Sequence, residues 1–188
     1  MRRRLNIDYD TFVFGSIGSL IPRKANHHTL AALAQFSRRE PDAKWKMVLA
    51  GEGAERAALT AQAKELGIEN NVIFTGFQNT PFDYLATFDA FILASKSEGL
   101  PRVVLEAMLL KIPVIGSQVT GTAELIDHES TGLLFPWSDV SQLAQHLDNI
   151  WADADLRARL AAAAYQNVCH TYAIENYVSG VEAVLGAH

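Results

Sequence analysis

Two carboxylates, Glu98 and Glu106, stand eight positions apart around an apolar run in the segment SEGLPRVVLEAM, residues 97–108. Pro101 suits the first turn of a helix, so Glu98 is expected in the loop before that helix and Glu106 within it. An unpaired buried carboxylate is costly, so Glu106 should face water or accept hydrogen bonds from a polar partner. Its two oxygens could accept from neighbouring ribose hydroxyls, with Glu98 contacting a second sugar. The alternative is that Glu98 is exposed and Glu106 lies on a solvent-side stripe.

A second cluster lies in GSLIPRK, residues 18–24, where Gly18 ends a predicted strand and Arg23 and Lys24 come just before a helix. Backbone N–H groups and the positive end of a helix favour an anion at such a turn, and a lysine ammonium adds a mobile charge. The segment therefore indicates a small phosphate site. The alternative interpretation is a solvated basic turn.

Two further turns carry glycines. In AGEGAER, Gly51 and Gly53 resemble the start of a dinucleotide fingerprint, but Arg56 stands where a third small residue belongs, which favours a tight connection without a ligand. In VTGTAELI, Gly121 permits close approach of the backbone and Thr122 can cap a short helix. That second turn could hold a phosphate or simply start a helix.

The elements that must position these residues alternate between short apolar runs and segments of helical period. This alternation is typical of a parallel sheet covered by helices, and it predicts a Rossmann-like α/β fold in which ligands bind beyond the carboxyl ends of the strands. Asn26 is the expected N-cap of the first long helix, and Ser138 or Asp139 that of the helical tail. The predicted strands lie within 11–20, 46–51, 71–77, 90–95, 112–117 and 132–135, and the predicted helices within 27–39, 55–67, 81–88, 97–108, 122–126, 139–168 and 174–186.

Composition limits the function classes. With 188 residues, 49% hydrophobic and 20% charged, the chain can bury the core of one domain. It has no apolar run of roughly 20 residues, and its basic start lacks the apolar core of a signal peptide, so a cytoplasmic protein is expected. Cys169 is the only cysteine, which excludes a disulfide framework and a cysteine-based zinc site. A net charge of -5 argues against nucleic-acid binding.

No metal site is expected. The acid pairs Asp8–Asp10 and Asp153–Asp155 imitate a metal-binding D-x-D pattern, but neither follows a predicted strand. His27 and His28 are adjacent, so on a helix they point apart, which is poor geometry for a shared ion. They fit a polar first turn near the phosphate-binding segment better.

Taken together, these motifs resemble glycosyltransferase family 4, whose retaining enzymes have the GT-B fold. Residues 95–139, SKSEGLPRVVLEAMLLKIPVIGSQVTGTAELIDHESTGLLFPWSD, are similar to its nucleotide-sugar signature, with Glu98 and Glu106 at the two acids of E-x7-E. GSLIPRK resembles the family's phosphate-binding G-R-L-x-x-x-K, LAGEGAER its second strand turn and VIFTGF its third. The match runs from about residue 12 to about residue 150 with the motifs in order.

The resemblance implies roles for individual residues. Glu106 would bind the ribose hydroxyls of a nucleotide diphosphate sugar, such as a UDP- or GDP-sugar, and no separate cofactor or metal is implied. Glu98, in contact with the transferred sugar, and Lys24, neutralising the diphosphate, are the catalytic candidates. The other candidate donor-binding residues are Gly18, Ser19, Arg23, Gly76, Phe77 beside the base, Gly99, Leu100, Pro101, Gly121 and Thr122.

The chain departs from the family pattern in two ways. Ser19 stands where the family usually has Arg, so one diphosphate cation is absent unless Arg23 or Arg102 substitutes. The match also covers only the second of the two GT-B domains. Residues 1–188 are therefore expected to form a single donor-binding domain, inactive alone, with the amino-terminal acceptor domain absent. In the full enzyme the acceptor would be a sugar, glycan or lipid, and peripheral membrane association is compatible with a lipid.

Three functions fit these observations. The first is the donor-binding half of a retaining glycosyltransferase. The second is a sugar-nucleotide epimerase domain of related architecture, which the continuous EGLPRVVLEAM and VTGTAEL segments disfavour. The third is a non-catalytic sugar-nucleotide-binding module, for which Ser19 is the only hint in the sequence.

Overall fold

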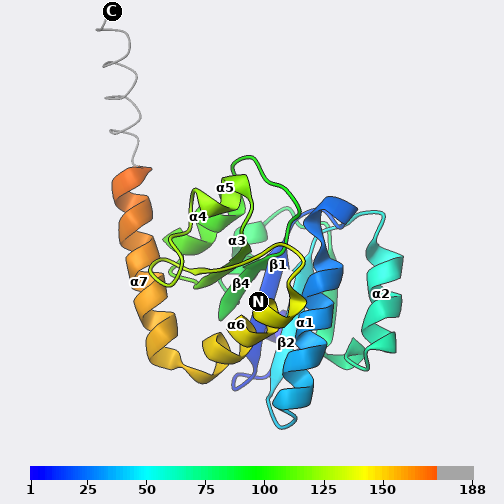
Figure 1. Cartoon of the computed structure of the whole chain (residues 1–188). Helices are drawn as coiled ribbons and strands as arrows, with labels where there is room; N and C mark the ends of the chain where they lie inside the picture. Colours follow the sequence, from blue (N-terminus) through cyan, green and yellow to red (C-terminus); the bar gives the residue numbers. More distant parts are fainter. Residues whose placement is uncertain (173–188) are drawn as a thin grey trace, which may run out of the picture.

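A six-stranded sheet with parallel neighbours forms the centre of the molecule (Figure 1), in a computed structural model that describes residues 1–172. The strand order is β3-β2-β1-β4-β5-β6, which confirms the predicted Rossmann-like α/β fold. The strand sequences are mostly apolar because helices cover both faces of the sheet. They are β1 (Phe12–Ile17), β2 (Trp45–Ala50), β3 (Val72–Gly76), β4 (Ala90–Leu93), β5 (Val114–Ser117) and β6 (Leu133–Phe135).

Two layers of helices cover the two faces of the sheet. Side chains alternate across a strand, so Phe14 packs beneath α1, α2 and α6 while its neighbour Val13 packs beneath α3, α4 and α7. In Figure 1, α7 runs along the flank of the molecule beside α4, with which it packs. The helices are α1 (Asn26–Arg39), α2 (Arg56–Glu65), α3 (Pro81–Leu85), α4 (Arg102–Leu109), α5 (Thr120–Ala123), α6 (Val140–Ala152) and α7 (Ala154–Thr171), with 3-10 turns η1 (Arg2–Leu5), η2 (Pro22–Lys24) and η3 (Glu69–Asn71).

The strand order reverses between β1 and β4. The chain first builds β2 and β3 on one side of β1 and then returns to place β4 on the other side, where Phe14 pairs with Ala90 and Gly15 with Phe91. In open parallel sheets, ligands bind in the crevice beyond the carboxyl ends of the strands at such a reversal. The loops that follow β1 and β4 are therefore the segments that position a ligand.

The start of α1 differs from the prediction. Ala25, with a left-handed φ of 47°, is the N-cap, and Asn26 is already the first helical residue, with no side-chain cap hydrogen bond there. Asn26 is also buried. The tight 3-10 turn η2 ends in this left-handed residue, so the chain enters α1 through backbone geometry and not through a capping side chain.

The predicted helical tail is two helices in the described part of the chain. Asp139 caps α6 as expected, since its Oδ1 accepts from the Gln142 amide at 2.9 Å. The run 139–168 then breaks at Asp153, whose backbone is extended and whose Oδ1 accepts from the Leu156 amide at 2.8 Å. The predicted helix 174–186 lies outside the described residues. Within residues 1–172, we find no helix long and apolar enough to cross a membrane.

Candidate functional site

The predicted site residues lie in loops at one edge of the sheet, where the parallel strands end. Four loops contribute, those that follow β1, β3, β4 and β5. Because the carboxyl ends of parallel strands meet at one edge, segments far apart in sequence become neighbours there. The loops supply Gly18, Ser19, Arg23 and Lys24 after β1, Gly76 and Phe77 at the end of β3, Glu98, Gly99, Leu100 and Pro101 after β4, and Gly121 and Thr122 after β5.

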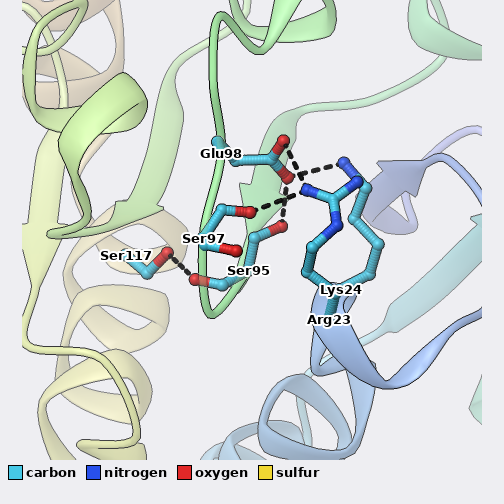
Figure 2. A network of polar contacts seen from close by, with 6 residues as sticks. All are labelled: Arg23, Lys24, Ser95, Ser97, Glu98 and Ser117. Atoms are coloured by element: carbon cyan, nitrogen blue, oxygen red, sulfur yellow. Dashed lines mark hydrogen bonds and ion pairs between the residues drawn. The ribbon is translucent and has the colours of Figure 1, made fainter.

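The centre of this edge is an ion cluster around Glu98 (Figure 2). The Glu98 carboxylate accepts from Lys24 Nζ at 2.6 Å and from Arg23 Nη1 at 3.1 Å. The Glu98 side chain is only 7% exposed and that of Lys24 15% exposed, whereas the Arg23 side chain is 46% exposed. Two cations thus meet one carboxylate, and the cluster keeps one positive charge in excess.

Hydrogen bonds to backbone carbonyls hold the two loops of this cluster together. The Lys96 amide donates to the Arg23 carbonyl at 2.8 Å, and Arg23 Nη1 donates to the Ser97 carbonyl at 2.7 Å. The loop after β4 is therefore fastened to the turn after β1 by main-chain atoms as well as by charge. This fixes Lys24 and Glu98 at the point where the strand order reverses.

Glu98 is ionised at neutral pH. Burial by itself raises the pKa of its carboxyl group, but hydrogen bonds from Lys24 and Ser95, the positive charge of Lys24 and a hydrogen bond from Arg23 together outweigh that effect. The pKa of Glu98 therefore lies below its ordinary value of 4.5. A charged, mostly buried acceptor of this kind can bind hydroxyl groups that enter the crevice.

Glu106 differs from Glu98 in its surroundings. It lies on α4, is partly buried, and has no ion pair or side-chain hydrogen bond with any residue of the described range 1–172. Its neighbours Val104, Ala107 and Met108 pack into the core. The carboxylate oxygens of Glu106 are therefore free to accept hydrogen bonds from a ligand, as the sequence predicts for a ribose contact.

The loop before α4 packs against the loop after β5 through two glycines. A Cβ placed on Gly121 would lie 1.5 Å from the carbonyl oxygen of Gly99, so only glycine allows this contact. Gly99 itself has open space around it, and Leu100 is 57% exposed. Pro101 is the N-cap of α4 and closes this loop. The predicted loop residues are thus brought together at the start of α4.

Val119 is the N-cap of α5 and no side-chain hydrogen bond caps that helix, so the predicted capping role is wrong for Thr122. Its side chain is fully buried, and its amide donates to the Val119 carbonyl at 3.0 Å, so that N–H group already has a partner. Thr122 Oγ1 has no hydrogen-bond partner among the described residues. Thr122 therefore lies beneath the surface of the loop, while Gly121 forms its contact with Gly99.

A pocket of about 260 Å³ opens at the carboxyl ends of β1, β2 and β3. Gly18, Ser19 and Phe77 line it, together with Gly51 and Glu52. Phe77 is 75% exposed, and Ser19 is also exposed. An exposed aromatic ring beside a small pocket can stack on a planar ring such as a nucleobase. The turn after β2, which the sequence treats as a tight connection, therefore also contributes to the wall of this pocket.

The glycine turn after β2 supports residues 18–24, the segment predicted to bind a phosphate. The Gly18 amide donates to the Ala50 carbonyl at 3.0 Å, and the Leu20 amide donates to the Glu52 carbonyl at 2.8 Å. A Cβ placed on Gly51, whose φ is +155°, would lie 1.9 Å from the Gly18 carbonyl oxygen. The close contact that Gly51 permits therefore sets the position of Gly18 and Ser19.

A larger hollow of about 440 Å³ lies at the opposite edge of the sheet, around the amino ends of the strands. Two ion pairs within the protein lie in its lining, Arg2 with Asp89 at 2.6 Å and Lys44 with Asp10 at 2.5 Å. None of the predicted site residues lines it. We therefore assign the candidate site to the carboxyl edge, although the hollow there is smaller.

Two serines of the site were missed by the sequence reasoning. Ser95 and Ser117 are completely buried, and both belong to the hydrogen-bond network of Glu98 (Figure 2). A polar residue directly after the apolar strand AFILA was the available signal, because a buried hydroxyl requires a partner. The identity of that partner depends on the folded loop and could not be inferred from order along the chain.

The acids and histidines considered as metal ligands have other contacts. Asp10 pairs with Lys44, and Asp153 caps α7. The expectation that His27 and His28 point apart is wrong, because their ring centroids lie 4.2 Å apart in an edge-to-face arrangement. Within residues 1–172, no three His, Cys, Asp or Glu side chains gather in a group that could hold a metal ion.

Known proteins resemble this chain in sequence and structure. The lipopolysaccharide core biosynthesis glycosyltransferase LpsE of Rhizobium meliloti strain 1021 is 30% identical over 174 residues, 93% of this chain and 49% of that protein. Anabaena Alr3699/HepE, solved in complex with UDP and glucose, superposes with a TM-score of 0.88 at 26% identity, over 100% of this chain and 51% of that one. A C-terminal domain of the group 1 glycosyl transferase LpcC from Francisella tularensis superposes with a TM-score of 0.77 at 26% identity, over 86% of each chain.

The matches cover nearly all of this chain but only part of most of these proteins. The chain spans less than half the length of the curated relatives it matches. The solved structures share its parallel sheet and helical layers, which agrees with the Rossmann-like half of a GT-B fold predicted from the sequence. The family model described as glycosyl transferases group 1 matches residues 1–167. The chain therefore belongs to the group 1 glycosyl transferases.

Proposed function

We propose that residues 1–188 form the donor-binding half of a retaining glycosyltransferase, which binds a nucleotide diphosphate sugar and, with a second domain, transfers the sugar to an acceptor. One observation carries this proposal. At the crevice where the strand order reverses, the Lys24 ammonium lies 2.6 Å from the buried Glu98 carboxylate, and α4, which follows that loop, carries the unpaired Glu106 carboxylate. Cations for a diphosphate and acceptors for sugar hydroxyls thus belong to the turn after β1, the loop after β4 and the helix α4 that follows it.

The phosphates of the donor bind between the loop after β1 and the start of α4. Lys24 and Arg23 supply positive charge, and the amides of Gly99, Leu100 and the first turn of α4 supply N–H donors. The excess positive charge of the Glu98 cluster supports this assignment, since it leaves charge for an anion even while Glu98 is ionised. Pro101 sets the beginning of α4 and so the direction of those donors.

The sugars of the donor bind to the two carboxylates. Glu106 accepts from the ribose hydroxyls, and Glu98 accepts from a hydroxyl of the transferred sugar. The contact of Gly121 with the Gly99 carbonyl holds the loop that carries Glu98 in place, and Thr122 is buried beside Gly121. The free carboxylate of Glu106 and the buried, ionised carboxylate of Glu98 support these roles.

The base of the donor occupies the pocket of about 260 Å³ at the ends of β1, β2 and β3. Phe77, which directly follows β3 and its last residue Gly76, stacks on the base, and Gly18 and Ser19 also line the pocket. A UDP- or GDP-sugar is the donor that we propose. The similarity to Alr3699/HepE, whose structure contains UDP, supports a uridine donor first.

The reaction that these groups favour is departure of a nucleoside diphosphate. Negative charge develops on the leaving oxygen, and Lys24, Arg23 and the amides at the start of α4 stabilise it because they are already oriented. We propose that donor binding needs no resident cofactor, since these groups supply the charge. Retention of the anomeric configuration follows from the resemblance to family 4.

The acceptor binds to the other half of the enzyme. We propose a sugar, glycan or lipid acceptor held by a further domain, with the isolated donor half inactive, because the chain spans 49% of LpsE and 51% of Alr3699/HepE. The match to a C-terminal domain of LpcC supports the assignment to the carboxyl-terminal half. A cytoplasmic location, with peripheral membrane association for a lipid acceptor, is part of the same proposal.

Calorimetric titration tests the donor role. UDP, GDP, ADP and the matching glucose or mannose conjugates are titrated into the protein with and without a metal chelator. We expect at least one nucleoside diphosphate to bind in the micromolar to low-millimolar range, equally well with the chelator. Absence of binding heat from every ligand at millimolar concentration would contradict the donor role. Loss of binding with the chelator would contradict the proposal that donor binding needs no resident cofactor.

A further inference from the structure

Two buried serines connect β5 to the Glu98 carboxylate (Figure 2). Ser117, the last residue of β5, donates its hydroxyl hydrogen to the Ser95 carbonyl at 2.6 Å. Ser95, just beyond β4, donates its own hydroxyl hydrogen to Glu98 Oε1 at 2.5 Å. Both serines are 0% exposed, so neither hydroxyl has water as an alternative partner.

The contacts of Glu98 come from two segments of the chain. Lys24 and Arg23 approach from the turn after β1, and they are the charged groups in contact with the carboxylate. Ser95 approaches from the strand that carries the Glu98 loop, and its hydroxyl shares Oε1 with Lys24. Figure 2 shows Ser95, Lys24 and Arg23 gathered around the carboxylate. The serine is therefore the neutral donor among the side chains that contact the Glu98 carboxylate.

A bound diphosphate would change the balance of these contacts. Its negative charge competes with Glu98 for the N–H donors of Lys24 and Arg23, because both anions draw on the same cations. The Ser95 hydroxyl carries no charge, so this competition leaves its bond to Glu98 in place. Ser117 restrains Ser95 from behind, which limits how far the hydroxyl can move.

We infer that Ser95, held by Ser117, is a positioning residue that fixes Glu98 for the transferred sugar while Lys24 and Arg23 engage the diphosphate. The inference rests on the proposed function and adds that different residues recognise the diphosphate and position the carboxylate that binds the transferred sugar. The cations determine affinity for the nucleoside diphosphate, and Ser95 determines how much further affinity the sugar adds. Neither serine itself contacts the ligand in this scheme.

The test combines two measurements on wild type, Ser95→Ala, Ser95→Thr and Ser97→Ala. Carboxyl ¹³C NMR titration follows the ionisation of Glu98 without ligand, and calorimetry compares the affinities for UDP and UDP-glucose. Ser95→Thr keeps the hydroxyl and serves as the conservative variant. Ser97→Ala is the matched control, because Ser97 enters the network through its carbonyl.

We expect Ser95→Ala to raise the pKa of Glu98, because the carboxylate loses a donor. Its UDP affinity should remain near the wild-type value, while the affinity gained from the glucose group falls about tenfold, the order of a hydrogen bond to a charged group. Ser95→Thr and Ser97→Ala should behave like wild type. If Ser95→Ala does not fold, Ser117→Ala should produce the same two shifts at smaller size.

Different results would separate the two proposals. A Ser95→Ala protein with unchanged Glu98 ionisation and an unchanged gain from glucose would overturn the positioning role. Equal loss of UDP and UDP-glucose affinity would also overturn it, since that pattern indicates general damage to the site. If wild type binds neither ligand, the donor assignment fails for uridine nucleotides, and the NMR titration alone decides whether Ser95 controls Glu98.

Discussion

Lys24 and Glu98 are 74 positions apart in the chain, yet Nζ of the lysine lies 2.6 Å from Oε1 of the glutamate. The contact joins the loops after β1 and β4, the two neighbouring strands between which the strand order reverses. It therefore connects the residue proposed for the diphosphate to the residue proposed for the transferred sugar. A substitution of Lys24 should therefore also change affinity for the transferred sugar, and a substitution of Glu98 should also change affinity for the diphosphate.

Replacement of Lys24 should weaken binding of the nucleoside diphosphate itself. Lys24→Met keeps much of the side-chain length and removes the charge, so UDP affinity should fall about tenfold to a hundredfold, as expected for loss of a charge-assisted hydrogen bond. Lys64→Ala, at an exposed position of α2, is the control and should bind normally. Titration calorimetry measures both variants, and equal affinities for UDP would exclude Lys24 from the diphosphate site.

The ionisation of Glu98 should make the stability of the site depend on pH. The pKa of Glu98 is lowered in the folded protein, so the ionised group contributes stability above its ordinary value of 4.5, and that contribution is lost as pH falls through the folded pKa. Glu98→Gln should therefore be less stable than wild type at pH 7, and the difference should shrink below about pH 4.5. Urea unfolding at pH 7, 5 and 3.5 measures this. A difference in unfolding free energy that stays constant with pH, or grows in acid, would contradict the lowered pKa of Glu98.

The two glycines that meet before α4, Gly99 and Gly121, should differ in how much stability they lose on replacement by alanine. Gly121→Ala places a Cβ 1.5 Å from the Gly99 carbonyl oxygen, and relief of that clash should cost about 2 to 4 kcal/mol in the free energy of unfolding. Gly99→Ala meets open space and should cost less than about 1 kcal/mol. Denaturant unfolding compares the pair. Similar stabilities of the two variants would mean that the close contact at Gly121 is not important.

An arginine at position 19 should strengthen donor binding. Ser19 is exposed beside the pocket at the ends of β1, β2 and β3, where the family pattern usually places an arginine. Ser19→Arg should raise UDP affinity about threefold to tenfold, and Ser19→Gln, similar in length but uncharged, should not. If arginine brings no gain, the absence of this cation has no bearing on donor affinity in this chain.

Much of the fold could be predicted because the buried parallel strands are short apolar runs separated by helical periodicity. AFIL and VIGS, for example, are fully buried along their whole length, and no other element fits them at that length. The break at Asp153 was missed because the apolar period continues past it, although an aspartate before a helical run is an N-cap signal. Asn26 was assigned as a cap from its residue type, while the left-handed Ala25 that performs this role carries no such signal.

The candidate site was predictable as a set of residues and not as a set of contacts. The spacing of Glu98 and Glu106 and the basic end of GSLIPRK indicated which side chains to consider. That Lys24 and Glu98 pair with each other depends on β4 lying beside β1, which the order of elements along the chain does not state. The roles of Ser95 and Gly121 likewise depend on atoms of loops that are distant in sequence.

The most direct test of the donor assignment is a binding cycle between Glu106 and the ribose hydroxyls. Wild type and Glu106→Gln are each titrated with UDP and with its 2′,3′-dideoxyribose analogue. We expect Glu106→Gln to lose about tenfold to a hundredfold in affinity for UDP but to bind the dideoxy analogue as wild type does. Equal loss for both ligands, or no loss for either, would contradict the claim that Glu106 binds the ribose of a nucleotide diphosphate sugar.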